Sequence, residues 1–174
     1  METVLNAMRE RRSVRKYKAD MPSREIIDKV IEAGLWAASG MGRQPCVIVA
    51  VTDKALRDRL SEMNRAIGGW QPGFDPFYGA PVALIVLADK SAPTAVYDGS
   101  LVMGNLMLAA HALGLGSCWI HRCKQMFELP EGKALLKKWG LPETLTGVAS
   151  IALGYAACEH PAAKPRKADY ILKV

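Results

Sequence analysis

The sequence has no uninterrupted apolar run of about 18 residues, which is the length that a membrane-spanning helix requires. It also has no internal repeat and no low-complexity tract, and no signal peptide opens the chain. Cysteines are few and mostly far apart in the sequence: Cys46, Cys118, Cys123 and Cys158. This pattern favours reduced thiols over a disulfide framework, so we expect a soluble protein of the cytoplasm.

Several catalytic and nucleotide-binding motifs are missing as well. No G-x-G-x-x-G follows a predicted strand and no G-x-x-x-x-G-K-[ST] occurs, so neither a dinucleotide Rossmann site nor a P-loop is indicated. There is no G-x-S-x-G nucleophile elbow. His121 lies between Cys118 and Cys123, but no second pair of ligands follows, which argues against a structural zinc site.

The composition is that of a globular protein. Hydrophobic residues make up 50% of the 174 residues and charged residues 23%, so we expect one domain that spans residues 1–174. The formal net charge is +6 and the pI is about 9.2. Such an excess suits an anionic partner, but it equally suits a soluble surface, and charge alone does not decide between them.

Helical and strand patterns alternate along the chain. The apolar spacing predicts helices at residues 3–10, 24–38, 54–64, 98–113 and 131–139, and strands at 46–52, 82–88, 117–121 and 148–153. The first two strands are continuously apolar, which predicts central strands covered on both faces. The helix at 98–113 is apolar nearly all round, as in a core or at a subunit interface, and we expect His111 on it to be a core histidine.

A basic segment follows the first helix. Residues 9–18 read R-E-R-R-S-V-R-K-Y-K and contain six basic residues and one acid. The planar guanidinium of arginine forms two parallel hydrogen bonds to a phosphate, and a serine hydroxyl adds a further donor. The segment can therefore be a phosphate grip, but it can also be the solvated basic end of a helix. A nucleic-acid site would need more aromatic residues than Tyr17 in this cluster.

Five segments in order resemble the FMN-dependent nitroreductase family, and together they cover almost the whole chain. They are R-R-S-V-R-K-Y, A-A-S-G-M-G-R-Q-P-C-V-I-V-A-V, G-A-P-V-A-L-I-V-L-A, A-A-H-A-L-G-L-G-S-C-W-I and I-A-L-G-Y with a late P-R-K. The resemblance implies an α+β fold with a central, mainly antiparallel sheet flanked by helices. It also implies a homodimer with two FMN sites at the subunit interface.

The resemblance assigns candidate flavin contacts to this chain. It places Arg11, Arg12, Ser13, Arg15 and the late Arg166 at the ribityl phosphate. It places Ala38, Ser39 and Met41 in the segment that the partner subunit lays against the flavin. Gln44 is a candidate near the ring or the substrate. Gly42 stands where the family often has asparagine, which removes any side-chain contact there.

Further candidates come from the middle of the chain. The segment G-S-C-W-I matches the strand that passes the isoalloxazine ring and suggests Cys118, Trp119 and Ile120. Asn64 is a candidate for the pyrimidine edge of the ring. Plain core packing is the alternative for Trp119 and Met41.

The family resemblance implies a flavin oxidoreductase. It would take a hydride from NAD(P)H and pass electrons to a small acceptor such as a nitroaromatic or a quinone, with ping-pong kinetics. No catalytic side chain is expected, because the flavin carries the chemistry. The Gly/Pro-rich loop at 68–81, with Trp70, Phe74, Phe77 and Tyr78, is a candidate substrate lid. The alternatives are a non-catalytic FMN-binding protein of the same fold and a flavin-free, basic nucleic-acid-binding module.

Overall fold

A four-stranded sheet forms the centre of the computed structural model, which describes residues 2–174. The strands are β1 (Cys46–Val51), β2 (Val82–Asp89), β3 (Gly116–Ile120) and β4 (Leu145–Gly154). Their order in the sheet is β1-β2-β4-β3, and every neighbouring pair is antiparallel. This confirms the expected α+β class and the antiparallel sheet.

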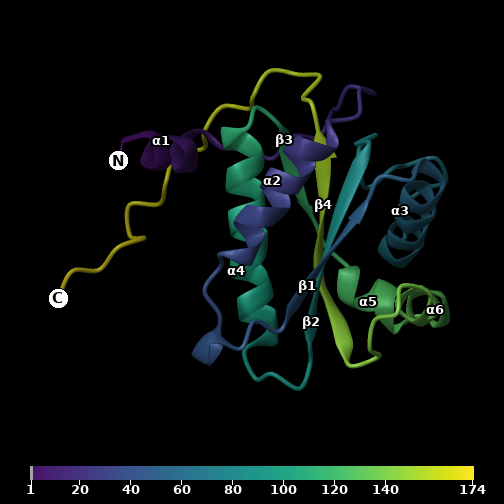
Figure 1. Cartoon of the computed structure of the whole chain (residues 1–174). Helices are drawn as coiled ribbons and strands as arrows, with labels where there is room; N and C mark the ends of the chain where they lie inside the picture. Colours follow the sequence, from purple (N-terminus) through teal and green to yellow (C-terminus); the bar gives the residue numbers. More distant parts are fainter. Residues whose placement is uncertain (1) are drawn as a thin grey trace.

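Helices cover both faces of the sheet (Figure 1). They are α1 (Glu2–Glu10), α2 (Arg24–Leu35), α3 (Lys54–Gly68), α4 (Ala95–Ala112), α5 (Cys123–Glu128) and α6 (Pro130–Lys138), with a short 3-10 turn at Gly40–Gly42. α2 and α4 lie on one face, and α3, α5 and α6 lie on the other. The patterns missed α5, because its six residues are too few for a helical period to stand out.

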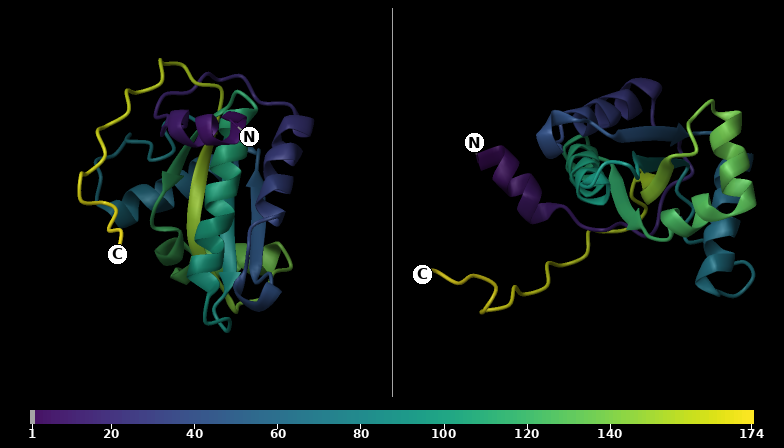
Figure 2. Two further views of the ribbon diagram at one scale, coloured as in Figure 1. Left: turned by 90° about the vertical axis from the view of Figure 1, so that its left-hand side faces the viewer. Right: turned by 90° about the horizontal axis from the view of Figure 1, so that it is seen from below.

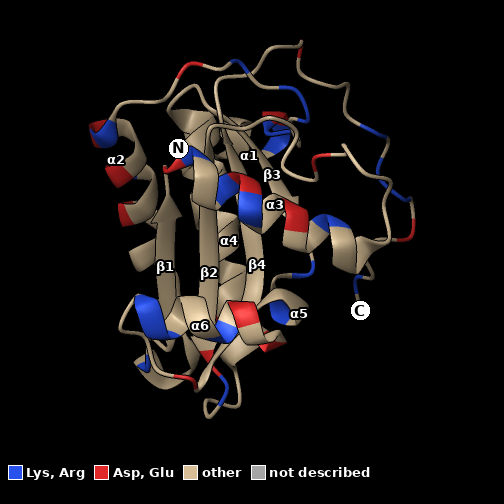
Figure 3. Cartoon of the chain, turned by 90° about the vertical axis from the view of Figure 1, so that its right-hand side faces the viewer, with Lys and Arg blue, Asp and Glu red and all other residues tan. Residues whose placement is uncertain are grey.

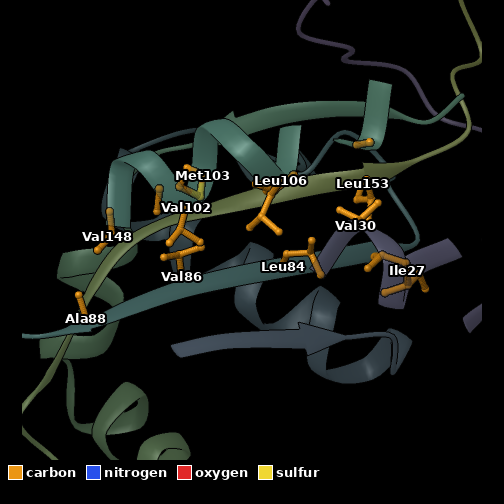
Figure 4. Close-up of a cluster of buried hydrophobic side chains, with 14 of the residues drawn as sticks. Ile27, Val30, Leu84, Val86, Ala88, Val102, Met103, Leu106, Val148 and Leu153 are labelled. Carbon is orange, nitrogen blue, oxygen red and sulfur yellow. The ribbon is translucent and has the colours of Figure 1, made fainter. Parts of the chain in front are cut away.

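β2 shows why the core has two halves. Val82, Leu84 and Val86 point to the side of α2 and α4, where they pack with residues such as Leu106 (Figure 4). The alternate residues Ala83, Ile85 and Leu87 belong to the second cluster, on the side of α3, α5 and α6. Side chains alternate between the faces of a strand, so a strand covered on both faces must be apolar throughout.

Two predicted placements are wrong. β1 is an edge strand in this chain, and most of its side chains are only half-buried. A continuous apolar run reports the character of the side chains and not the number of neighbouring strands, so it could not separate an edge from a centre. His111 is half-buried, and its ring lies 5.6 Å from the ring of His160.

The two ends of the chain lie outside the layered body. α1 contacts α4, and the segment at 156–174 runs without regular helix or strand, with its end away from the sheet (Figure 2). None of the helices in residues 2–174 combines the length and the apolar character that crossing a bilayer would take.

Charges of both signs are interspersed on the face formed by α3, α5 and α6 (Figure 3). Several of them pair: Lys54 with Asp58, Arg59 with Glu131 and Arg65 with Glu62. This face is therefore not the single-sign surface that nonspecific phosphate-backbone binding requires.

Candidate functional site

The basic segment lies beside β3. Ser13 forms a parallel bridge with Ser117, and the backbone N–H of Val14 donates to the carbonyl of Ser117 at 3.0 Å. The two backbones approach so closely that a Cβ on Gly116 would lie 2.9 Å from the side chain of the fully buried Val14. The structure thus brings the R-R-S and G-S-C-W-I motifs together, although about 100 residues separate them in the sequence.

The same segment also pairs with residues 155–157. The backbone N–H of Lys18 donates to the carbonyl of Tyr155, and the backbone N–H of Ala157 donates to the carbonyl of Lys16, each at 2.9 Å. The hydroxyl of Tyr17 lies 2.7 Å from the carbonyl of Val14. Residues 13–18 are therefore held on two sides by backbone pairing. The alternative of a basic helix end describes Arg12 in part, because its Nη1 also donates to the carbonyls of Arg9 at 2.5 Å and Arg11 at 2.9 Å at the end of α1.

Three polar atoms at this junction are buried and have no hydrogen-bond partner in the part of the chain that is described. They are Nη1 of Arg11, Nε of Arg12 and Oγ of Ser117. A buried guanidinium N–H without an acceptor is costly, and an anion with several oxygens is the ligand that satisfies two of them at once. These residues therefore fit the phosphate of FMN.

The neighbouring side chains of β3 are compatible with a cation-rich site. Cys118 is buried, and burial raises the pKa of its thiol, while Arg15, a hydrogen bond from Ser13 and Arg11 oppose the rise. Trp119 is half-buried and Ile120 is buried. Arg15 is exposed, and its charge acts on Cys118 from outside the core.

Asn64 lies near the far end of β3. It is fully buried on α3, and its Nδ2 donates to the carbonyl of His121 at 2.6 Å. Its Oδ1 has no partner among the described residues. An unpaired buried amide oxygen calls for an N–H donor, and the pyrimidine edge of a flavin carries one.

A second group of candidates lies in the turn between α2 and β1. Met41 and Gln44 have φ values of 55° and 49°, a conformation that non-glycine residues rarely adopt and that is enriched at functional sites. Oγ of Ser39 accepts from the N–H of Gln44 at 3.0 Å. The buried Asp98 of α4 fixes the turn by accepting from the N–H of Gly40 at 2.9 Å.

This turn and the basic segment lie at opposite ends of α4. Asp98 holds the turn near the start of the helix, whereas Arg11 and Arg12 lie close enough to His111, near its end, to act on that ring. Burial lowers the pKa of His111, and His160 and these two arginines lower it further. Thirteen residues of helix separate the two positions, which is about 20 Å at 1.5 Å per residue. Ala38, Ser39, Met41 and Gln44 are therefore not brought to the arginines within one copy.

Arg166 lies in the exposed segment at 156–174. No hydrogen bond or ion pair joins it to the basic segment within residues 2–174 of one copy. The sequence placed it at the phosphate through the family resemblance alone, and that assignment remains a prediction.

The aromatic loop differs from the expected lid at one residue. Phe77 is fully buried in the core beneath α3, so it offers no stacking surface to an acceptor. The rings of Trp70 and Phe74 are 5.0 Å apart, and Phe74 meets Tyr78 edge to face at 6.2 Å. Asp75 fixes the loop by accepting from the nearly buried Arg57 at 2.5 Å. The Gly/Pro-rich composition of the loop could not reveal that a single residue, Asp75, anchors it.

The sequence patterns did not single out Ser117 or Arg122, which lie in β3 and two residues beyond its end. Ser117 belongs to the G-S-C-W-I segment, but only its pairing with Ser13 reveals its buried hydroxyl. Arg122 has a φ of 74° and lies directly after the turn that ends β3. Among the described residues, no group of three or more His, Cys, Asp or Glu side chains is arranged to hold a metal ion.

The layered α+β fold and the unpaired buried donors beside β3 are compatible with a protein that binds an anionic ligand such as a phosphate. Comparison with known proteins identifies the family: the model of the nitroreductase family matches residues 8–68 and 69–155, and the chain belongs to this family.

Solved and curated relatives agree with this assignment. An FMN-bound nitroreductase from Bacteroides fragilis is 30% identical, with a TM-score of 0.88 and 98% of each chain covered. An FMN-bound nitroreductase from Desulfitobacterium hafniense is 28% identical, with a TM-score of 0.89 and 100% of this chain and 99% of that chain covered. The FMN reductase [NAD(P)H] of Bacillus subtilis is 26% identical. The match covers 95% of this chain and 70% of the relative.

Proposed function

We propose that this chain is an FMN-dependent oxidoreductase that takes electrons from NAD(P)H and passes them to a small acceptor such as a nitroaromatic or a quinone. Family membership and the FMN-bound relatives support the cofactor and the class of reaction. The observation that carries the proposal is that one buried nitrogen in each of two neighbouring guanidinium groups, Nη1 of Arg11 and Nε of Arg12, has no hydrogen-bond partner among the described residues. We treat residues 1–174 as one FMN-binding domain.

The side chains of this chain bind and orient the cofactor. When bound, FMN supplies hydride acceptance and electron transfer, so no protein nucleophile is needed. Arg11, Arg12 and Ser13 would hold the phosphate through charge-assisted hydrogen bonds, with Arg15 adding positive charge. Asn64 would orient the ring edge through its free Oδ1.

Backbone and side chains of β3 would lie along the ring. Cys118, Trp119 and Ile120 belong to the strand whose neighbour is the phosphate segment, so ring and phosphate contacts come from adjacent backbones. Cys118 and Ile120 belong to a buried apolar cluster, which would exclude water from the side of the isoalloxazine ring that faces β3.

We further propose that the protein is a homodimer with two such sites at the interface. The turn with Ala38, Ser39, Met41 and Gln44 is about 20 Å along α4 from the arginines, so a second copy is needed to bring both groups to one flavin. Large apolar side chains are exposed on α1, on α4, at the end of α2 and in the 3-10 turn that follows it: Val4, Leu5, Met8, Leu35, Trp36, Met41, Val96, Tyr97 and Leu101. Apolar patches of this kind mark interaction sites.

A groove between α1 and α4 supports the same arrangement. It has a volume of about 800 Å³, and its lining includes Val4, Ala7, Leu108 and Ala109. Helices of a second copy would fill it with apolar side chains. Arg166, from the exposed tail, would then reach a phosphate site at the interface. The four free cysteines support a reducing compartment, which we propose is the cytoplasm.

The test combines spectroscopy with mass measurement. The purified protein should show a flavin spectrum with about one FMN per chain, should bleach anaerobically with NADH or NADPH, and should sediment as a dimer. Arg166→Ala should lower FMN affinity about 10-fold or more, while Arg59→Ala, a surface change on α3, should leave it unchanged. A flavin that neither nucleotide bleaches would indicate a non-catalytic FMN-binding protein. A colourless protein that takes up no FMN would refute the proposal.

A further inference from the structure

Arg122 has an unusual backbone. It is the residue before α5, two residues beyond the end of β3, and has φ 74° and ψ 9°, in the left-handed region that residues with a Cβ rarely adopt. Only four non-glycine residues in the described chain have positive φ, and two of them, Met41 and Gln44, are candidate flavin contacts. Such outliers persist where the surroundings hold them, and they gather at binding sites.

The side chain of Arg122 is held but not neutralised. Its guanidinium lies over the ring of Trp70, with its central carbon 4.4 Å from the ring centroid. Within residues 2–174 no carboxylate pairs with it and no hydrogen bond engages it, unlike Arg57, Arg59 and Arg65, which all have acidic partners. One face of the guanidinium rests on the indole, while its N–H edges remain free for a ligand.

Trp70 is itself fixed in place. Its carbonyl accepts from Nη1 of Arg65 at 2.5 Å, and its ring packs against Phe74, which in turn packs against Tyr78. The anchored Asp75 holds this row of rings in position. Arg122 therefore presents its charge next to an ordered set of flat aromatic surfaces.

This platform borders the candidate flavin site. Arg122 adjoins His121, whose carbonyl is hydrogen-bonded to the buried Asn64, and it lies two residues beyond Ile120 of β3. With the ring edge at Asn64, as proposed above, Arg122 is one residue along the chain from the backbone carbonyl that Asn64 contacts, which places Arg122 at the border of the acceptor side of the site.

We propose that Arg122, supported by Trp70, selects flat aromatic acceptors that carry a carboxylate. A carboxylate accepts two parallel hydrogen bonds from one guanidinium, and a guanidinium that is already oriented by a ring loses little freedom on binding. The acceptor ring can stack on the exposed ring of Phe74, which is 40% exposed. A neutral analogue can stack there equally well, so the carboxylate accounts for the difference in binding between the two acceptors. This inference rests on the proposed function and names a substrate class for the same site.

The experiment compares two acceptors with one scaffold on the FMN-loaded enzyme. 4-Nitrobenzoate carries the carboxylate, and 4-nitrobenzyl alcohol is its neutral counterpart. The parent enzyme should show the lower KM for the acid. Arg122→Ala should raise the KM for the acid 10-fold or more and change the KM for the alcohol less than 3-fold, with kcat for both nearly constant. Arg122→Lys should recover part of the loss, because it restores the charge without the planar fork.

A binding measurement without turnover separates the outcomes. Benzoate should perturb the flavin absorbance of the oxidised parent enzyme, and Arg122→Ala should weaken that binding by the same factor. Arg59→Ala serves as the matched control, since it removes an arginine that is exposed and paired with Glu131. A third measurement compares the KM for NADH and for NADPH in the parent and in Arg122→Ala, because the phosphates of these nucleotides are the other anions that would enter the site.

Three results would overturn the inference: equal effects of Arg122→Ala on acid and alcohol, no effect on either, or a change confined to the NADH or NADPH KM. If the flavin bleaches normally in these cases, the proposed function stands and only the role of Arg122 falls. If the protein binds no FMN, the proposed function fails and the inference fails with it.

Discussion

Replacing Asp75 by asparagine tests how the aromatic loop is anchored. The carboxylate accepts four hydrogen bonds: from Nη2 of Arg57 and Oγ of Ser61, each at 2.5 Å, and from the N–H groups of Phe77 at 2.8 Å and Gly79 at 2.7 Å. Each oxygen accepts two of them. Asparagine keeps one oxygen, so about two of these bonds are lost.

The expected cost follows from burial. Hydrogen bonds to charged groups contribute about 1.5 to 3 kcal/mol each, and removing one partner of a fully buried ion pair costs about 3 to 5 kcal/mol. The side chain of Asp75 is 31% exposed, so solvent screens part of its interaction and the lower end of that range applies. Arg57 is only 7% exposed, but it keeps its bonds to Asp58 and to the carbonyl of Ala80. We therefore expect Asp75→Asn to lower the free energy of unfolding by about 3 kcal/mol, measured by urea denaturation at fixed protein and FMN concentrations.

Glu131→Gln is the matched control. Glu131 also accepts two short hydrogen bonds from one arginine, but that arginine, Arg59, has an exposed side chain, whereas the Arg57 that pairs with Asp75 is buried. Solvent screens the exposed pair, so Glu131→Gln should cost much less than Asp75→Asn. Equal losses in the two variants would refute the reasoning that burial makes the Asp75 anchor strong.

Acid should narrow the difference between Asp75→Asn and the parent. Burial by itself raises the pKa of Asp75, but hydrogen bonds from Ser61, Arg57 and two backbone N–H groups together lower it below the ordinary value of 3.8. A lowered carboxyl pKa stabilises the fold above pH 3.8, and this contribution is lost as the pH falls through the folded-state pKa. A gap between parent and variant that stays constant down to pH 3 would count against this assignment.

Three further outcomes are expected. Arg11→Ala should weaken FMN binding by about 1.5 to 3 kcal/mol, the scale of hydrogen bonds to charged groups, with Arg59→Ala unchanged in a fluorescence titration. Gly116→Ala should lower the melting temperature and loosen FMN together, because the new Cβ would lie 2.9 Å from the side chain of the buried Val14. His111→Asn should reduce the stability lost as the pH falls below 6.5: burial lowers the pKa of His111, so the unfolded chain takes up the proton first. Identical pH profiles for variant and parent would exclude that contribution.

The order of helices and strands was readable from the sequence, because long apolar patterns determine it. β2 shows the limit of this reading: its apolar run correctly predicted burial on both faces, whereas the similar run in β1 belongs to an edge. Hydrophobic periodicity describes one segment at a time, and strand order depends on how segments pair.

The site was only partly readable for a related reason. The motif R-R-S indicated an anion, but its contact with Ser117 joins residues about 100 positions apart and has no local pattern. Arg122 was missed because an arginine in a left-handed conformation looks like any other arginine in a sequence. Phe77 was misassigned because a Gly/Pro-rich loop can be anchored by one partly buried ion pair, here between Arg57 and Asp75.

The double tether of residues 13–18 links cofactor binding to the integrity of the sheet. β3 is the last strand of the sheet, and an uncovered edge strand can pair with the edge of another molecule and aggregate. The basic segment covers part of that edge at Ser13 and Val14, and is held on its other side by residues 155–157. The side chains that we propose bind the phosphate therefore belong to a backbone segment that cannot detach without exposing this edge of the sheet. Backbone amide hydrogen exchange at residues 13–18 and 116–120 should accordingly slow in step when FMN is added.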